Sequence, residues 1–339
     1  MKKTVLYRCC VLLLAMSMLA GCGNESSKAA APAAPETTAL FPVVLQTDWY
    51  AQPEHAGFYF ARSAGYYREA GLDVTIRPGA NFTNIPQLVA SNRVQFAVGT
   101  SDGMLMAISR GIPLLGLFPY FQHDPQCVMF HKASGIQSLR DLDGRTVMLN
   151  PAAAYVQYLQ RTLGIRLQLI PLDYSLARFL GDPTFIQQCF LTSEPYYVAK
   201  QGVDPGVLPL SSSGFDPYRL VYTNREFADA NPELVRGFVA ASLRGWRDYM
   251  ASDGSLAHTE IGQLNDQQSP EFMAWTKAAM QSNQLVFGRP EEQETLGLIK
   301  RSRLDEHIGH LESLGLLGGP VDASVAFGWD YLPDDLVRD

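Results

Sequence analysis

Two series of alternating strand-like and helix-like segments constrain the fold of this chain more than any other feature. The first series covers residues 43–110, where short apolar runs alternate with amphipathic segments that end at glycine. This order predicts a parallel sheet with right-handed crossovers. The second series, at 138–201, repeats the pattern. Two similar α/β halves predict a ligand site in the crevice between them, at the carboxyl ends of the strands.

The boundaries of these segments define two lobes. In the first series we expect strands at 43–47, 72–76 and 95–98 and helices at 57–70, 85–91 and 102–110. In the second we expect helices at 138–142, 152–163, 175–180 and 195–201 and strands at 146–149, 167–170 and 185–191. Strands at 126–131 and 219–223 are predicted to cross between the lobes, and amphipathic helices are predicted at 232–250, 270–282 and 290–314. This assigns 41–130 plus 216–339 to lobe 1 and 131–215 to lobe 2.

The N-terminal segment indicates export. A positively charged start precedes an apolar run of ten residues, 11–20, which is too short to span a bilayer stably. The run ends in Leu19-Ala20-Gly21-Cys22, which resembles the lipobox of bacterial lipoproteins. We therefore expect a signal peptide at 1–21, lipidation at Cys22 and a flexible Ala-, Pro- and Ser-rich tether at 22–40. The alternative is an ordinary secretory signal followed by an incidental cysteine.

Charge and cysteine content exclude several classes of protein. Removal of the three basic residues of the signal lowers the basic count from 27 to 24 against 34 acidic residues, a net charge of about −10. Such a chain is a poor nucleic-acid ligand. Cys127 and Cys189 lie in apolar surroundings, and we expect two unpaired buried cysteines rather than a disulfide. The sequence contains no metal-ligand spacing, and we predict neither metal nor cofactor.

The beginning of the body resembles the NMT1/THI5-like family, which includes periplasmic binding proteins for thiamin-pyrimidine precursors, relatives proposed to bind riboflavin, and fungal pyrimidine synthases. The resemblance is dense in the segments LQTDW, EHAGFYFA and AGYYREAGLDV, at residues 45–49, 54–61 and 64–74. It continues more loosely to about residue 250. It implies the two-lobed, type II-like periplasmic binding protein fold, with mostly parallel sheets and helices on both faces.

Candidate ligand contacts follow from strand ends and from this resemblance. Trp49 ends the first strand and matches the family's Asp-Trp pair, so its face is expected to stack on a flat ligand. His55 and Gly57 flank the start of the next helix, where free N–H groups are available. For each of them packing in the core or helix capping is the competing interpretation.

The remaining candidates lie at other corners of the predicted cleft. Thr100 and Ser101 offer hydroxyl groups between a strand and a helix, where they could also serve only as an N-cap. Glu194 follows an apolar strand, and its carboxylate would accept hydrogen bonds in the crevice or form a structural ion pair. Tyr120 and Tyr155 complete the set.

Together these features favour a non-enzymatic solute-binding lipoprotein of an ABC importer, anchored to a bacterial membrane and facing the periplasm or the exterior. It is expected to be a monomer that binds a small flat heteroaromatic molecule, of the thiamin-pyrimidine type or, alternatively, riboflavin. Its partners would be the permease and ATPase subunits. The rival is a pyrimidine synthase, but those enzymes carry a clustered cysteine motif and no export signal, whereas this chain has separated cysteines and a lipobox.

Overall fold

A five-stranded mixed sheet forms the centre of lobe 1 in the computed structural model, which describes residues 39–80, 84–333 and 336–338. The strand order is β2-β1-β3-β10-β4, and all strands except β10 run in one direction. The strands are β1 (Phe41–Gln46), β2 (Leu72–Arg77), β3 (Phe96–Thr100), β4 (Leu114–Phe121) and β10 (Arg219–Asn224).

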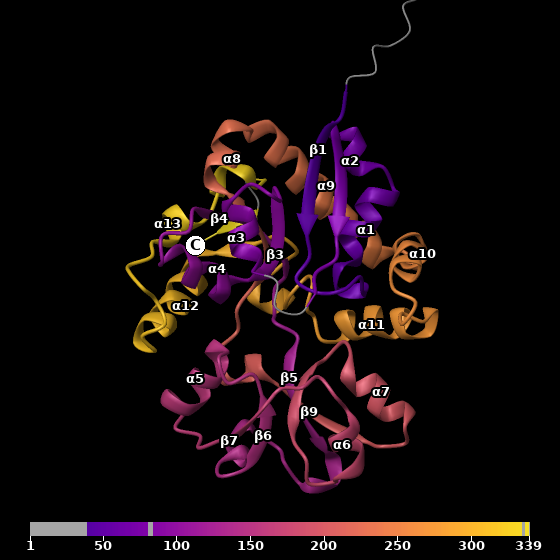
Figure 1. The fold of residues 1–339 in the computed structure, drawn as a ribbon, viewed down its shortest axis with the longest axis vertical. Helices are drawn as coiled ribbons and strands as arrows, with labels where there is room; N and C mark the ends of the chain where they lie inside the picture. Colours follow the sequence, from indigo (N-terminus) through magenta and orange to yellow (C-terminus); the bar gives the residue numbers. More distant parts are fainter. Residues whose placement is uncertain (1–38, 81–83, 334–335, 339) are drawn as a thin grey trace, which may run out of the picture. The chain divides into compact units, whose positions relative to one another are not determined.

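A second five-stranded sheet forms the centre of lobe 2 (Figure 1). Its order is β7-β6-β8-β5-β9, and here β5 runs against its neighbours. The strands are β5 (Gln126–His131), β6 (Thr146–Leu149), β7 (Gln168–Pro171), β8 (Gln187–Phe190) and β9 (Pro205–Pro209). The expected α/β fold with mostly parallel sheets is confirmed.

The single antiparallel strand of each sheet is the one that follows a passage between the sheets. β4 leads through residues 122–125 into β5, and β9 leads through 210–218 into β10. A chain that leaves one sheet at its carboxyl edge enters the other sheet at the same edge, so the new strand must run the opposite way. We expected 126–131 and 219–223 themselves to cross. That expectation was wrong, because both segments pair along their whole length within one sheet.

Helices cover both faces of the sheets. Around the first sheet lie α1 (Ala56–Ser63), α2 (Tyr66–Glu69), α3 (Ile85–Ala90), α4 (Ser101–Ile108), α8 (Arg225–Ala230), α9 (Pro232–Ala251), α10 (Ser255–Leu264), α11 (Pro270–Ser282), α12 (Arg301–Ser313) and α13 (Ala323–Ala326). Around the second lie α5 (Ala154–Arg161), α6 (Ala177–Gly181) and α7 (Glu194–Lys200). Short 3₁₀ turns occur at Pro53–His55 (η1), Lys132–Ser134, Leu139–Leu142, Leu210–Ser213, Pro290–Glu292 and Trp329–Tyr331, and a small ribbon pairs β11 (Ile299–Lys300) with β12 (Val337–Arg338).

Two predicted helices are interrupted in the structure. The segment 57–70 is divided into α1 and α2 because Gly65 adopts φ 83°, a left-handed conformation that ends a helix. The segment 290–314 begins with a 3₁₀ turn and the strand β11, and only Arg301–Ser313 is α-helical. Gln293 and Gly297 both have positive φ in the connection between them.

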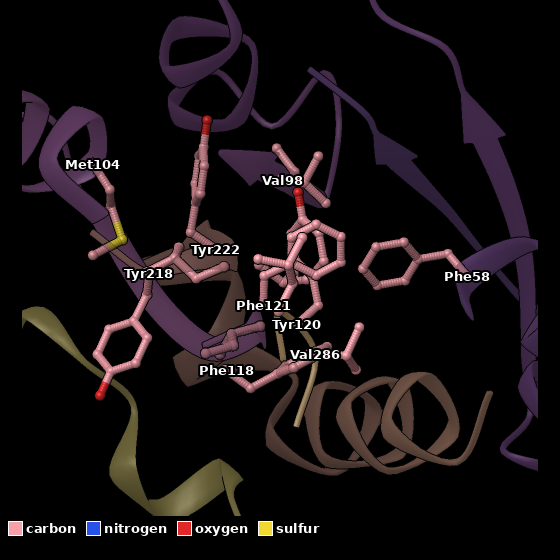
Figure 2. Close-up of a cluster of buried hydrophobic side chains, with 14 of the residues drawn as sticks. Phe58, Val98, Met104, Phe118, Tyr120, Phe121, Tyr218, Tyr222 and Val286 are labelled. Carbon is pink, nitrogen blue, oxygen red and sulfur yellow. The ribbon is translucent and has the colours of Figure 1, made fainter. Parts of the chain in front are cut away.

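The core of lobe 1 is unusually rich in aromatic side chains. Figure 2 shows Tyr120, Phe121 and Phe58 among the aliphatic side chains of the sheet. Tyr120 is fully buried, with its ring centroid 5.4 Å from Phe58 and 5.5 Å from Trp246 of α9. This aromatic layer joins α1, α9 and β4 and supports the segment that follows β1.

A disulfide joins Cys127 of β5 to Cys189 of β8, so the expectation of two unpaired cysteines was wrong. The two residues lie opposite each other in the antiparallel β5–β8 pair, with their Cα atoms 4.9 Å apart. The bond closes a loop between positions 62 residues apart and ties the crossing strand to the centre of the second sheet.

Removal of this bond should lower stability without changing the fold. In the chain-entropy description a loop of this length contributes about 4 kcal/mol, the upper end of the range typical of disulfides. We expect the double variant Cys127→Ser/Cys189→Ser to lose about that free energy of unfolding, measured by denaturant titration. Dithiothreitol should destabilise the wild type but leave the double variant unchanged, and equal sensitivity of both proteins to the reductant would contradict the assignment.

Candidate ligand-binding site

A cavity of about 230 Å³ lies between the two sheets. Its walls come from the segments that follow β1 and β7, from β8 and the segment after it, and from the beginnings of β5 and β10. Because the parallel strands of both sheets end at this edge, side chains from both lobes meet here. The lining residues are Asp48, Trp49, Gln52, Glu54, His55, Pro125, Gln126, Leu172, Tyr174, Gln187, Gln188, Phe190, Ser193, Glu194 and Arg219.

An ionic triad forms the lobe 1 wall. Asp48, just after β1, contacts Nε2 of His55 at 2.9 Å and forms an ion pair with Arg219, the first residue of β10. Burial alone would raise the pKa of Asp48, but the guanidinium of Arg219 and the hydrogen bond from His55 hold it at about 2. The carboxylate therefore stays ionised, and this part of the wall is electrically balanced.

The guanidinium group of Arg219 contacts further polar and aromatic side chains. Its Nε donates to the hydroxyl of Tyr120 at 3.2 Å, its Nη1 lies 3.6 Å from Asp124, and its guanidinium carbon lies 5.7 Å from the ring centre of Phe190. Burial raises the pKa of Asp124 to about 6 despite the nearby guanidinium. A buried guanidinium with this many partners serves mainly to organise the wall.

An aromatic platform stands at the opening of the cavity. Trp49 is half-buried, and its ring centroid lies 5.3 Å from that of Tyr174, which comes from lobe 2. Tyr174 is 56% exposed and has φ 62°. Positive φ is strained for a bulky residue and persists where the surroundings require it. The two rings, one from each lobe, contact each other at an angle of 38°, so a flat ligand would lie against their cavity side rather than between them.

Two glutamates contribute the acidic part of the wall. Glu54 lies in η1 of lobe 1 and accepts a hydrogen bond from Thr192 at 2.7 Å. Glu194 begins α7 of lobe 2 and accepts from the backbone N–H of Phe190 at 2.7 Å. Burial raises the pKa of both carboxyl groups, that of Glu194 to about 7, and the charge of Glu54 adds to the latter effect. At least one of them therefore binds a proton readily near neutral pH.

Several buried polar atoms of this wall have no protein partner. They are Oε2 of Glu54, Oε1 of Gln187 and Nδ1 of His55. Buried polar groups in proteins are nearly always hydrogen-bonded, so these atoms call for a partner that the described part of the protein does not supply. The amide oxygen of Gln187 is an acceptor, whereas Oε2 of Glu54 accepts when the carboxyl group is ionised and donates when it is protonated.

Three of the eight candidate contacts line the cavity: Trp49, His55 and Glu194. Tyr120 and Tyr155 stand behind the wall, where Tyr120 supports Arg219 and the hydroxyl of Tyr155 donates to Gln188. Both are buried in the cores of their lobes.

The other three candidates serve helix packing, helix capping and the attachment of the chain segment before β10. A side chain at Gly57 would place its Cβ 2.1 Å from the ring of Trp246, so this glycine allows α9 to pack on α1. Thr100 caps α4 by accepting from Gly103 N–H, as the alternative interpretation held. Ser101 exchanges hydrogen bonds with the backbone of Tyr218. None of the three is part of the cavity wall.

The sequence interpretation missed most of the polar wall. Asp48 and Glu54 were noted only as parts of motifs, and Arg219 was not considered. Arg219 stands 171 positions from Asp48, and a lone arginine at a strand start carries no local signal. The glutamines at 52, 126, 187 and 188 could have been suspected, since three of them lie at the beginning of β5 or β8, two strands that the sequence predicts.

The family model described as "NMT1/THI5 like" matches residues 52–253. The chain belongs to this family. A riboflavin-binding protein, RibY, of Chloroflexus aurantiacus is 26% identical over 95% of this chain and 96% of its own length. A formylaminopyrimidine-binding protein of Halalkalibacterium halodurans is 23% identical over 93% and 96%. Among solved structures, the periplasmic aliphatic sulphonate binding protein SsuA from Escherichia coli superimposes with a TM-score of 0.65, at 13% identity, over 84% of this chain and 91% of that one.

These comparisons confirm the expected family and the periplasmic binding protein fold, and with them the interpretation as a solute-binding protein. Residues 1–38, with the predicted signal peptide, Cys22 and most of the tether, lie outside the described part of the chain. In the part that is described, no helix is both long and apolar enough to cross a membrane.

The raised pKa of Glu194 predicts a pH dependence of stability. A carboxyl group that titrates at about 7 in the folded protein and at about 4.5 when unfolded favours the folded state at low pH. This contribution is lost as the pH rises from about 4.5 to 7. Over that interval we expect the wild type to lose on the order of 1–3 kcal/mol more unfolding free energy than Glu194→Gln does.

Denaturant titrations at several pH values would measure this difference. The matched control is Glu312→Gln, which removes an exposed glutamate from α12. It should retain the wild-type slope. A Glu194→Gln variant with the same slope as the wild type would show that Glu194 is ionised and solvated in the folded protein.

Proposed function

We propose that this chain is the solute-binding component of an ABC importer and captures an aminopyrimidine of the thiamin-precursor type between its two lobes. The observation that carries the proposal is a cavity with an aromatic platform at its mouth and unpartnered carboxyl and amide oxygens in its wall. A pyrimidine ring is flat enough to lie against Trp49 and Tyr174, and its amino group supplies the donors that these oxygens lack.

The acidic wall supports this class of ligand over others. Glu54 and Glu194 line the cavity from opposite lobes. An amino group beside a ring nitrogen can donate to one carboxyl oxygen while the ring nitrogen accepts from a protonated carboxyl group. Because Glu194 titrates near neutral pH, it can supply either form.

Size and charge argue against the alternatives. The cavity, at about 230 Å³, is below the range of about 300–1,000 Å³ typical of drug-sized ligands, which favours one ring over the three fused rings of a flavin. A sulfonate would require free cationic groups. Arg219 is the one lysine or arginine among the described residues that line the cavity, and Asp48 and Asp124 already neutralise it.

The same features support a binding role rather than synthase chemistry. The pyrimidine synthases of the family carry clustered cysteines, whereas the two cysteines in the described ranges are joined to each other and buried in lobe 2. Neither offers a free thiol to the cavity. We therefore include the absence of catalysis in the proposal, together with docking of the monomer to permease and ATPase subunits.

Lipid anchoring through Cys22 belongs to the same proposal and has its own test. The Leu19-Ala20-Gly21-Cys22 segment and the tether after it support an anchored, exported protein. In a bacterial host, the wild type is expected in the membrane fraction and labelled by a radioactive or alkynyl fatty acid. Cys22→Ser should lose the label and remain unprocessed or leave the membrane. Labelling that survives this substitution would refute the anchor.

The ligand class can be tested directly by calorimetric titration. We expect an aminopyrimidine such as 4-amino-5-hydroxymethyl-2-methylpyrimidine to bind and riboflavin to bind far more weakly. Native mass spectrometry of the protein purified from its own host should show a retained mass of this class. Tight binding of riboflavin, visible as a yellow colour of the protein, would show that the ligand is a flavin and refute the aminopyrimidine proposal.

Trp49→Ala provides the matched structural test. Stacking of a base on an aromatic ring is worth about 1–3 kcal/mol, so the variant should bind about tenfold to a hundredfold more weakly. Its melting temperature should change little because Trp49 is only half-buried. Trp329→Ala, which truncates a half-buried tryptophan outside the cavity, is the control and should keep wild-type affinity. Equal affinities of both variants would remove Trp49 from the site.

A further inference from the structure

A buried chain of hydrogen bonds runs from α11 to the cavity. Oγ1 of Thr276 donates to the carbonyl oxygen of Thr192 at 2.9 Å, and Oγ1 of Thr192 donates to Oε1 of Glu54 at 2.7 Å. Both threonines are fully buried, and Glu54 is 5% exposed. Each bond joins segments that are distant in the sequence, by 84 positions in the first case and 138 in the second.

Both bonds cross from one lobe to the other. Thr192 belongs to lobe 2, in the connection between β8 and α7, whereas Glu54 in η1 and Thr276 in α11 belong to lobe 1. Thr192 is therefore inserted between two segments of the opposite lobe. When the lobes separate, both bonds must break together.

Helix α7 of lobe 2, which begins two residues after Thr192, lies below α11 of lobe 1 in Figure 1, and side chains of the two helices contact each other. The ring of Tyr196 lies 5.3 Å from that of Trp275, and the ring of Tyr197 lies 4.8 Å from that of Phe272. An ion pair at 2.6 Å joins Lys200 of α7 to Glu271 of α11. Helix α7 thus begins at Glu194 in the cavity wall, and its following residues pack against lobe 1.

The geometry points to Thr192 as a positioning residue, which holds the Glu54 carboxyl group in the orientation that the ligand meets. Thr276 in turn holds Thr192 through its hydrogen bond to the Thr192 carbonyl oxygen. Glu54 lines the cavity; Thr192 occupies its Oε1, and its Oε2 is buried without a hydrogen-bond partner. A hydroxyl group of lobe 2, that of Thr192, thus orients the Glu54 carboxyl group of lobe 1. The site is therefore complete only while the lobes are in contact. The inference rests on the proposed function for the identity of the ligand, but not for the positioning of Glu54.

A merely structural role for Thr192 would leave the ionisation of Glu54 unchanged. The hydroxyl group stabilises the carboxylate and opposes the effect of burial, which raises the pKa of Glu54. Loss of this bond should raise that pKa further. An aminopyrimidine would also meet a carboxyl group that is no longer held in one orientation.

The test compares Thr192→Val, which keeps the shape and removes the hydroxyl group, with Thr192→Ser, which keeps the hydroxyl group. Thr223→Val is the matched control, because it also removes a buried threonine hydroxyl group, one that donates to Gln95 O in lobe 1. The pKa of Glu54 is followed in the full chain by carbon-13 NMR of labelled glutamate side chains, with Glu54→Gln identifying the signal. Affinity for 4-amino-5-hydroxymethyl-2-methylpyrimidine is measured across pH 5–9.

We expect Thr192→Val to move the Glu54 titration to higher pH and to weaken binding about tenfold or more, the scale of a lost bond to a charged group. Thr192→Ser should restore both, and Thr223→Val should change neither. Wild-type behaviour of Thr192→Val in the titration and in affinity would overturn the positioning role. If the aminopyrimidine does not bind to the wild type, the proposed function fails, and the NMR titration alone decides the role of Thr192.

Discussion

The buried ion pair of Arg219 with Asp48 is the constraint on which the site depends. A guanidinium group out of contact with water is costly unless it is paired and hydrogen-bonded, and removal of one partner leaves an uncompensated charge. Arg219 begins β10, the first strand after the chain returns from lobe 2, and Asp48 follows β1. The pair therefore joins the beginning of β10 to the end of β1, beside the cavity.

Two carboxyl groups of the cavity illustrate opposite balances of burial and charge. The ion pair with Arg219 and the hydrogen bond from His55 hold the pKa of Asp48 at about 2, whereas burial raises that of Glu194, on the opposite lobe, to about 7. One wall thus carries a fixed, neutralised pair, and the other carries a carboxyl group that can gain or lose a proton. A ligand that both donates and accepts hydrogen bonds meets suitable partners at this second wall.

The regular elements could be predicted because their signals are local. The strand β1 and the helices α9 and α11 agree with the expected segments to within two residues, since apolar periodicity, proline and glycine mark their ends. β4 and β9 were missed because each precedes a passage between lobes, where the alternation of strand and helix stops. The disulfide depends on the register of β5 against β8, which no local pattern reveals.

The β3–α4 corner shows why the site was only partly predictable. Hydroxyl groups at a strand end suggest ligand contacts, and Thr100 and Ser101 have that position. In this fold the antiparallel strand β10 enters beside β3, and its approach occupies the corner: Ser101 N–H donates to Tyr218 O at 2.8 Å, and Tyr218 N–H donates to the Ser101 hydroxyl group at 3.1 Å. Ligand contacts are consequently displaced to the end of β1, where Asp48, Trp49 and His55 remain open to lobe 2. The topology of the crossing, rather than the chemistry of the corner residues, determines which strand end serves the ligand.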